Sequence, residues 1–474
     1  MTALDTQLRA ALQERLLPIV RVVGEDERGQ MAARLAHYAC PGVGVAVIED
    51  GQMAWRGGFG ELERGSTRLV GPDAIFAGAS ISKPVTAALV MQQVERGALD
   101  LDADVNHYMS EWQVPVNEFT RRQPVSLRHL LSHRAGTTVH GFGGFPPGVA
   151  KPSALDTLYG RPPALTPAVT VDKTPGGSIR YSGGGYTVVQ QLLQELTGKP
   201  FAQLAREMIF EPLGMASSSF GDPLPEEITA RTASGHDGAG EPLPEKWPCC
   251  PQAAAGGIYV SAADYALFMG SCRNAYVGRK TPLMMPQTAR NMIDSRGDGD
   301  FALGWRVLGH GSEARISHGG SNEGYQCETT CYLESGKGAV VLTNAPSGAL
   351  LYWEVLNTIA EVCDWPGFLR APKVIQPMDA AGRRRFVGRY PIVSGVDAPY
   401  VDICEQGNML LSHIQGHNAP PVPALMAADG RIFNRYSPYE TEVVFDASGL
   451  AVELIAFDGD TEILRARRSL APAS

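Results

Sequence analysis

The sequence lacks the marks of several large classes of protein. None of its eight cysteines forms a C-x-x-C pair, so neither a zinc site nor a thioredoxin-like centre is indicated. The formal net charge of -9 argues against nucleic acid as the main partner. No apolar run is long enough to span a bilayer, and the first residues lack the basic and apolar regions of a signal peptide. We therefore expect a cytoplasmic globular protein with structural thiols, without metal, cofactor or membrane partner.

One stretch stands out in what is present. From Ile81 to Val94 the residues are apolar or uncharged apart from Lys83, which is typical of a helix buried on all sides. Ser80 and Lys83 are three residues apart and would share one helical face. Because burial disfavours a charged amine, Lys83 could take the proton of the Ser80 hydroxyl. The structural alternative is that Ser80 only caps the helix and Lys83 reaches the surface.

Two further short motifs follow in the chain. Tyr181-Ser-Gly183 lies in a glycine-rich turn before a helix predicted over 187–197, where backbone can approach a ligand. His318-Gly-Gly320 lies on a predicted strand over 315–320. Alone, Tyr181 could be a buried aromatic residue and His318 an ordinary strand residue. The sequence contains only one S-x-x-K, however, and the three motifs together indicate catalysis.

The pattern along the chain predicts an α+β domain with a helical insertion. A hairpin is expected around Asp50-Gly51, and later strands are expected to join it in one antiparallel sheet. A Gly/Pro-rich segment over 137–180, with few helix or strand signals, is expected to form a lid or substrate wall. The other predicted elements are a helix over 4–38 broken near Gly29, strands over 42–48, 52–60, 301–307, 325–333 and 338–343, and helices over 126–133, 261–272 and 350–363.

A domain boundary is expected between Pro372 and Pro377. Residues 1–371 would form the main domain, and residues 377–474 a separate small antiparallel β-barrel or sandwich of short alternating strands. His129 and His133 are four residues apart, as metal ligands can be, but no third ligand adjoins them. We therefore favour structural hydrogen bonding for both histidines.

The ordered motifs resemble those of the penicillin-recognising serine hydrolases. This family includes class C β-lactamases, D-alanyl-D-alanine carboxypeptidases, D-aminopeptidases and β-lactamase-like carboxylesterases. The resemblance covers roughly residues 30–365 and implies a β-lactamase/transpeptidase-like antiparallel sheet flanked by helices, with a helical subdomain. It also implies that the N–H of Ser321 is an oxyanion donor beside the N–H of Ser80. The C-terminal region resembles the lipocalin-like barrels of longer members.

The chain departs from the family pattern at two positions. Gly183 stands where the second motif usually has Asn, and His318 stands where the third motif often has Lys. The lost Lys weakens the case for β-lactams and for substrates with a free carboxyl terminus. We expect His318, Gly319, Gly320 and Gly183 to contact substrate, since a substrate can lie directly against a glycine-containing strand.

These observations lead to one functional hypothesis and several alternatives. We expect a serine hydrolase that cleaves an ester or amide of a small molecule or peptide through an acyl-Ser80 intermediate, of the esterase or D-amino-acid-specific peptidase type. Lys83, or a Tyr181 phenolate stabilised by Lys83, would be the general base. The alternatives are an acyltransferase or peptide macrocyclase, a β-lactamase, and a non-catalytic penicillin-binding sensor. The barrel would wall the active site or build a homodimer interface.

Overall fold

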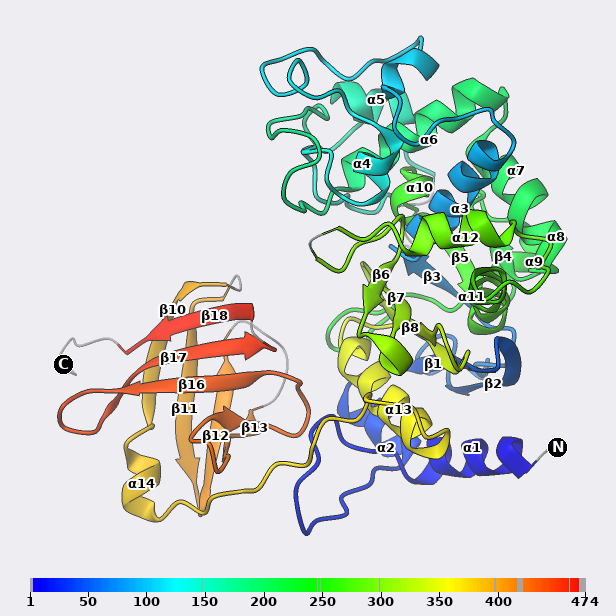
Figure 1. The fold of residues 1–474 in the computed structure, drawn as a ribbon. Coiled ribbons are helices and arrows are strands. Elements are labelled where there is room, and N and C mark those ends of the chain that lie inside the picture. Colours follow the sequence, from blue (N-terminus) through cyan, green and yellow to red (C-terminus); the bar gives the residue numbers. More distant parts are fainter. Residues whose placement is uncertain are drawn as a thin grey trace. The chain divides into compact units, whose positions relative to one another are not determined.

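The computed structural model of the protein describes residues 3–146, 148–244, 246–247, 249–297, 299–395, 398–415, 421–459 and 461–468. The chain forms two compact units (Figure 1). The first comprises Met1–Arg9, Leu35–Tyr352 and Cys363–Pro366, and the second comprises Ala10–Arg34, Trp353–Val362 and Gly367–Ser474. The domain boundary expected near residues 372–377 stays a prediction.

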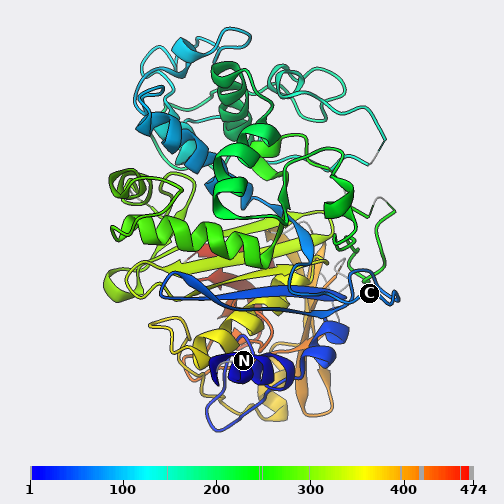
Figure 2. The same cartoon turned by 90° about the vertical axis from the view of Figure 1, so that its right-hand side faces the viewer.

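A six-stranded antiparallel sheet forms the centre of the first unit, in the order β2-β1-β9-β8-β7-β6. The predicted meeting of the hairpin with the later strands is thus confirmed, since β1 pairs with both β2 and β9. Helix α11 (Ala262–Tyr276) packs across β1, β2 and β9 (Figure 2). The strands are β1 (Gly42–Glu49), β2 (Gln52–Gly60), β6 (Arg306–Leu308), β7 (Arg315–Asn322), β8 (Tyr325–Tyr332) and β9 (Gly338–Thr343).

The strand predicted over 301–307 is largely wrong, because only β6 forms there. Gly304 has φ +83°, a left-handed conformation that bends the chain, and the Ala302 N–H donates to the Trp305 carbonyl across this turn. The extended conformation therefore begins only at Arg306. Beyond that point, β6 pairs with the first three residues of β7 and leaves the rest of that edge open.

The helix predicted over 4–38 is also wrong in its middle. Helix α1 (Ala3–Glu14) ends well before Gly29, and helix α2 (Met31–His37) begins after it. Pro18 has no N–H to donate and restricts the residue before it, so the helix cannot continue. Leu16 and Gly29 instead exchange backbone hydrogen bonds of 2.8 and 2.9 Å.

Helix α3 (Ser82–Glu95) runs through the interior of the first unit, as its apolar sequence predicts. Twelve consecutive residues from Ser82 to Gln93 are buried. The helix packs against helices α6, α7, α10 and α12 of the helical insertion. Their bounds are α6 (Gly183–Thr197), α7 (Phe201–Ala205), α10 (Ala253–Gly256) and α12 (Pro286–Ile293).

A second, three-stranded sheet carries the chain into α3. Strand β3 (Ile75–Ala79) pairs with β5 (Ile258–Ser261), which also pairs with the two-residue strand β4 (Ser218–Ser219). The whole length of β3 is buried. The chain therefore passes from a buried strand to a buried helix at Ser80.

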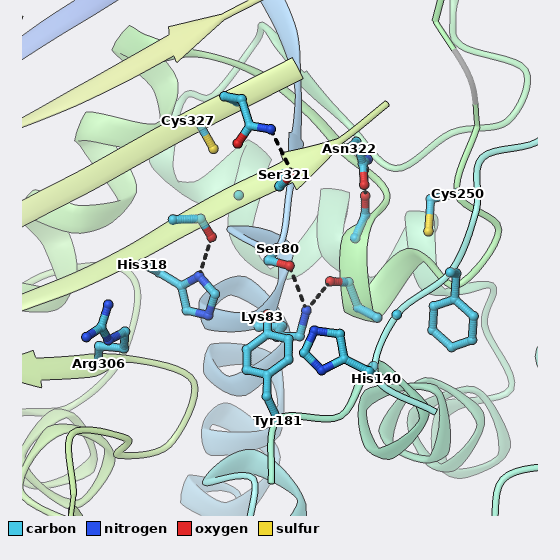
Figure 3. Close-up of a pocket in the computed structure, with 18 of the residues that line it drawn as sticks. Ser80, Lys83, His140, Tyr181, Cys250, Arg306, His318, Ser321, Asn322 and Cys327 are labelled. Atoms are coloured by element: carbon cyan, nitrogen blue, oxygen red, sulfur yellow. Dashed lines mark hydrogen bonds between the residues drawn. The ribbon is translucent and has the colours of Figure 1, made fainter. Parts of the chain in front are cut away.

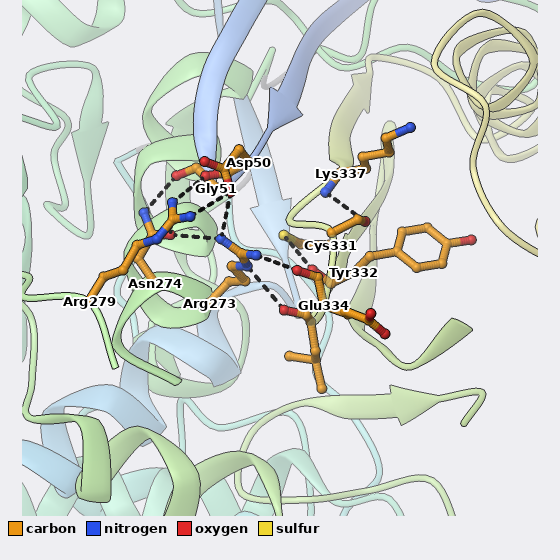
Figure 4. A network of polar contacts seen from close by, with 11 residues as sticks. Asp50, Gly51, Arg273, Asn274, Arg279, Cys331, Tyr332, Glu334 and Lys337 are labelled. Carbon is orange, nitrogen blue, oxygen red and sulfur yellow. Dashed lines mark hydrogen bonds and ion pairs between the residues drawn. The ribbon is translucent and has the colours of Figure 1, made fainter. Parts of the chain in front are cut away.

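The buried Arg273 of α11 holds two turns of the central sheet in place (Figure 4). Its side chain is 4% exposed and donates to the carbonyls of Leu333 and Glu334 after β8. It also pairs with Asp50 in the β1–β2 turn at 3.3 Å. Arg279 pairs with the same carboxylate from a more exposed position.

We predict that Arg273→Ala destabilises the protein by roughly 2–4 kcal/mol, because the buried Leu333 carbonyl and the Glu334 carbonyl would lose their donor. The matched control is Arg279→Ala, which removes an exposed partner of Asp50 and should have little effect. Urea denaturation followed by tryptophan fluorescence compares the two variants. Equal stability losses in both would contradict the role given to the buried guanidinium.

The second unit contains a nearly closed antiparallel barrel, as the short alternating strands predict. Its nine strands follow the order β13-β12-β11-β10-β18-β17-β16-β15-β14. The two end strands, β13 and β14, are separated in sequence only by Ala424. The strands are β10 (Gly388–Ser394), β11 (Tyr400–Gln406), β12 (Met409–Ile414), β13 (Val422–Pro423), β14 (Leu425–Met426), β15 (Ile432–Phe433), β16 (Glu440–Phe445), β17 (Ala451–Asp458) and β18 (Thr461–Arg467).

The inward side chains of the barrel form their own hydrophobic core. Phe386, Tyr390, Leu410 and Leu454 are at most 3% exposed. The buried Tyr390 hydroxyl donates to the Phe386 carbonyl at 2.6 Å, which satisfies its polar group. Within the described ranges of both units, no helix has the length and apolar character needed to cross a membrane.

Candidate active site

Ser80 lies at the turn between β3 and α3, in a tightly held piece of backbone. The preceding residue, Ala79, has φ +49°, which is unusual for a residue other than glycine and indicates local strain. The Ser82 hydroxyl donates to the Ala79 carbonyl at 2.7 Å and accepts from the Ile258 N–H at 3.0 Å. These bonds fasten the turn to β5, so the position of Ser80 is determined by the packed interior.

Lys83 points from the first turn of α3 toward Ser80 (Figure 3). It is 2% exposed, and its Nζ donates to the Ser80 Oγ at 3.0 Å and to the Ala255 carbonyl at 2.6 Å. Neither partner carries a charge, so neither compensates the desolvation of the ammonium as a carboxylate would. The arrangement places the Lys83 amine in direct contact with the Ser80 hydroxyl.

Tyr181 covers the Lys83 side chain from the other side of the site. The Lys83 Nζ lies 4.8 Å from the centroid of the Tyr181 ring. Ser182 caps helix α6 by accepting from the Gly185 N–H, and the helix begins at Gly183 instead of near Thr187. The glycines predicted to form a turn thus form the first helical turn, because they are packed closely against the 137–140 segment.

His133 is a residue of the site that the sequence did not assign to it. Its ring stacks on Tyr181 with centroids 4.2 Å apart, and its Nδ1 accepts from the Ser182 N–H at 3.2 Å. Burial, with a smaller contribution from the charge of Lys83, holds the pKa of His133 well below its usual value. His133 is therefore a neutral support for Tyr181.

The hydrogen bonding expected for both histidines is observed. The His129 Nδ1 accepts from the Ser126 N–H and completes a capping box at the start of helix α4 (Leu127–Leu131). Among the residues that the structure describes, no group of three or more His, Cys, Asp or Glu side chains could hold a metal ion.

Strand β7 brings His318, Gly319, Gly320 and Ser321 along one wall of the site. Its pairing with β6 stops at Ser317, so the edge from His318 onward is open on that side. The opposite edge is fully paired with β8. An extended group of a substrate can therefore lie beside these residues.

Both glycines of β7 lie in closely packed surroundings, and at Gly320 the contact is with backbone. A side chain at Gly320 would collide with the Gly78 carbonyl of β3 and come within 2.6 Å of the Cys327 sulfur. At Gly319 it would come within 2.8 Å of a Glu328 carboxylate oxygen. Gly320 thus permits β7 to approach the strand that carries Ser80.

We predict that Gly320→Ala lowers turnover at least about tenfold and also lowers the melting temperature, because β7 must move away from Gly78. Gly71→Ala is the matched control, since no atom lies within 4 Å of the position of its new methyl group. Steady-state kinetics and thermal denaturation test both variants. Full activity of Gly320→Ala would show that the gap between the strands is not needed.

The segment predicted as a lid or substrate wall reaches the site near Gly183. The Gly183 N–H donates to the His140 carbonyl at 2.8 Å, and a side chain at Gly183 would come within 2.9 Å of the Phe142 ring. No room is left there for the Asn side chain of the family motif. The segment also contains helix α5 (Ala154–Tyr159), which its Ser153-x-x-Asp156 capping box could have revealed.

All eight residues singled out in the sequence line one cavity of about 800 Å³. A second hollow of about 520 Å³ shares Phe142, Ser321, Asn322 and Gln326 with it. No sequence motif marked several other residues that line the first cavity. These include His140, Phe142, Phe301, Arg306, Asn322 and Gln326.

His318 is a buried titratable residue on the open part of β7. It is 3% exposed, and its Nδ1 lies 2.6 Å from the Gly319 carbonyl oxygen. Burial, together with the nearby charge of Lys83, lowers the pKa of His318 to about 3. The imidazole is therefore neutral at physiological pH and differs from the Lys of the family motif in charge.

The central antiparallel sheet with its helices and helical insertion has the penicillin-binding and β-lactamase fold. The family model described as "Beta-lactamase" matches residues 28–352, more than half of the chain. The chain therefore belongs to the Beta-lactamase family, which confirms the resemblance drawn from the motifs. Its relatives include serine hydrolases named as esterase and aminopeptidase.

Two curated relatives show the range of this family. The chain is 28% identical over 376 residues to "Penicillin-binding protein 4" of Amycolatopsis lactamdurans, covering 74% of this chain and 93% of that protein. It is 23% identical over 324 residues to "D-aminopeptidase" of Brucella anthropi, covering 66% of this chain but only 58% of that protein. The alignment thus leaves a large part of the aminopeptidase unmatched.

A solved structure shows the shared fold over both units. The octameric penicillin-binding protein homologue from Pyrococcus abyssi matches with a TM-score of 0.59 at 19% identity. The match covers 92% of this chain and 98% of that chain. The combination of hydrolase fold and C-terminal barrel is therefore shared with a known structure.

Proposed function

We propose that this chain is a serine hydrolase that cleaves an amide or ester through an acyl-Ser80 intermediate. The observation that supports this best is the 3.0 Å hydrogen bond between the Lys83 Nζ and the Ser80 Oγ inside the interior. A serine hydroxyl becomes a useful nucleophile when an adjacent base takes its proton. The Lys83 amine is the group placed to take this proton, because its Nζ is the hydrogen-bond partner of the Ser80 Oγ.

In the first half of the reaction, Lys83 takes the Ser80 proton while the Oγ attacks the substrate carbonyl. The N–H groups of Ser80 and Ser321 stabilise the oxyanion of the tetrahedral intermediate. The proton then passes to the leaving group, whose bond to the carbonyl carbon breaks. In the second half, water attacks the acyl-Ser80 ester, the same groups accept and return its proton, and the acid product leaves.

The geometry supports Lys83 over Tyr181 as the general base. The Lys83 Nζ bonds directly to the Ser80 Oγ, whereas Tyr181 presents the face of its ring to this nitrogen. We assign two roles to Tyr181. Its ring holds Lys83 in place, and its hydroxyl passes the proton toward the leaving group. His133 supports Tyr181 by stacking and by its bond to Ser182.

The substrate class is an uncharged ester or a D-amino-acid amide, with β-lactams less favoured. A buried neutral His318 supplies no cation for the carboxylate of a β-lactam. Relatives named as D-aminopeptidase and esterase support the same choice. A cavity of about 800 Å³ has room for a substrate of this size.

We expect a fluorophosphonate to form one covalent adduct, on Ser80, detected by intact mass and by mass spectrometry of the peptide. The hydroxyl is activated by Lys83, so the Ser80→Ala variant should show no adduct and no turnover. Ser82→Ala is unsuitable as a control because the Ser82 hydroxyl holds the turn next to Ser80 by hydrogen bonds. Ser219→Ala is the matched control, since Ser219 lies outside the cavity. A folded wild-type protein without an adduct on Ser80 would refute the proposed function.

We also expect Lys83→Met to lower kcat by about 10²–10⁴-fold, because the base is lost while an apolar chain of similar length remains. Tyr181→Phe should have a smaller effect, since the phenyl ring still covers the site. Lys199→Met, which removes a surface lysine paired with Glu207, is the matched control. A larger loss in Tyr181→Phe than in Lys83→Met would transfer the role of base to Tyr181.

A further inference from the structure

His318 has a buried ring nitrogen without a partner. Of the described residues that line the active cavity, His318 is the one with a buried side-chain nitrogen or oxygen that makes no hydrogen bond. This atom is Nε2, on a side chain that is 3% exposed. A buried polar atom without a partner is costly and in a binding site indicates a missing ligand group.

The other ring nitrogen determines what kind of ligand group is missing. The His318 Nδ1 lies 2.6 Å from the Gly319 carbonyl oxygen, which can only accept a hydrogen bond. The proton of the neutral ring is therefore on Nδ1, and Nε2 presents a lone pair. The charged groups that act on this ring are the cations Lys83 and Arg306, and both disfavour a second proton on it.

The position of His318 indicates which group of the substrate lies next to this lone pair. With the carbonyl carbon at Ser80 and its oxygen at Ser321, the two remaining substituents extend in opposite directions along β7. One direction leads past Asn322 and Gln326 into the second hollow. The other leads to His318, on the side of the site where Tyr181 lies (Figure 3).

The leaving group must lie on the side of the groups that protonate it. Tyr181, which we assign to the proton path, defines that side, and the His318 ring centroid lies 6.4 Å from that of Tyr181. The acyl group then extends into the second hollow. The unpartnered Nε2 therefore faces the leaving group.

We propose that the Nε2 of His318 accepts a hydrogen bond from the N–H of the leaving group, so that the preferred substrate is a primary or secondary amide and not an ester. This inference rests on the proposed acyl-Ser80 function and narrows it. An amide nitrogen keeps its hydrogen throughout the attack and donates it to Nε2 without proton transfer. An ester oxygen has no hydrogen, so its lone pairs would face the lone pair of His318.

The test compares an amide with a matched ester. D-phenylalanine amide and D-phenylalanine methyl ester, with 4-nitroacetanilide and 4-nitrophenyl acetate as a second pair, are assayed with wild type, His318→Leu and His318→Gln. The readout is the ratio of kcat/KM for amide over ester. We expect this ratio to fall about 10- to 100-fold in His318→Leu, which has no acceptor, and less in His318→Gln, which keeps one.

His310→Gln is the matched control. His310 is exposed, pairs with Arg296 and does not line the cavity, so this variant should keep the wild-type ratio. The rate of fluorophosphonate labelling at Ser80 shows whether each variant keeps an intact site. The ratio of kcat/KM for amide over ester is compared only among variants that are labelled at the wild-type rate. One His318 variant that meets this condition is enough for the test.

Two results would overturn the inference: an unchanged ratio in the His318 variants, or a wild type that cleaves neither amide. Failure of the proposed function is a separate result. In that case cleavage would persist in Ser80→Ala, or no adduct would form on Ser80. Ser80-dependent cleavage with an unchanged ratio would leave the hydrolase assignment intact and remove only the role of His318.

Discussion

The burial of one amine next to one hydroxyl is the constraint on which the site depends. Lys83 is held in the interior by α3, whose residues from Ser82 to Gln93 are all buried. Its two hydrogen bonds, to Ser80 and to the Ala255 carbonyl of α10, place the amine between the strand-to-helix turn and the helical insertion. A shift of either element would break one of these hydrogen bonds and move the amine away from the Ser80 hydroxyl.

Close backbone approach is the second constraint, and it explains one departure from the family motif, Gly183, in physical terms. Gly320 lets β7 pass next to Gly78, so that Ser80 and Ser321 border the same cavity. Gly183 leaves room for the His140 carbonyl and the Phe142 ring, which occupy the space of a side chain. The neutral His318 then presents a hydrogen-bond acceptor where a lysine would present a cation.

Much of the fold could be predicted from local patterns. The hairpin over β1 and β2, the buried helix α3, the later strands and the C-terminal barrel follow from alternation, turn residues and apolar runs. The errors lie where single residues override a pattern. Pro18 prevents the single long helix that the apolar periodicity suggested, and Gly304 bends the chain where a longer strand was expected.

By itself, the sequence determines that Ser80 and Lys83 lie three residues apart at the start of an apolar helix, because spacing and an apolar run are local properties. It also orders the Tyr181 and His318 motifs along the chain. Only the tertiary structure decided that these residues border one cavity, that His133 stacks on Tyr181 and that Gly183 has no room for a side chain. The tautomer of His318 belongs to this second group, since it depends on which atoms packing brings to the two ring nitrogens.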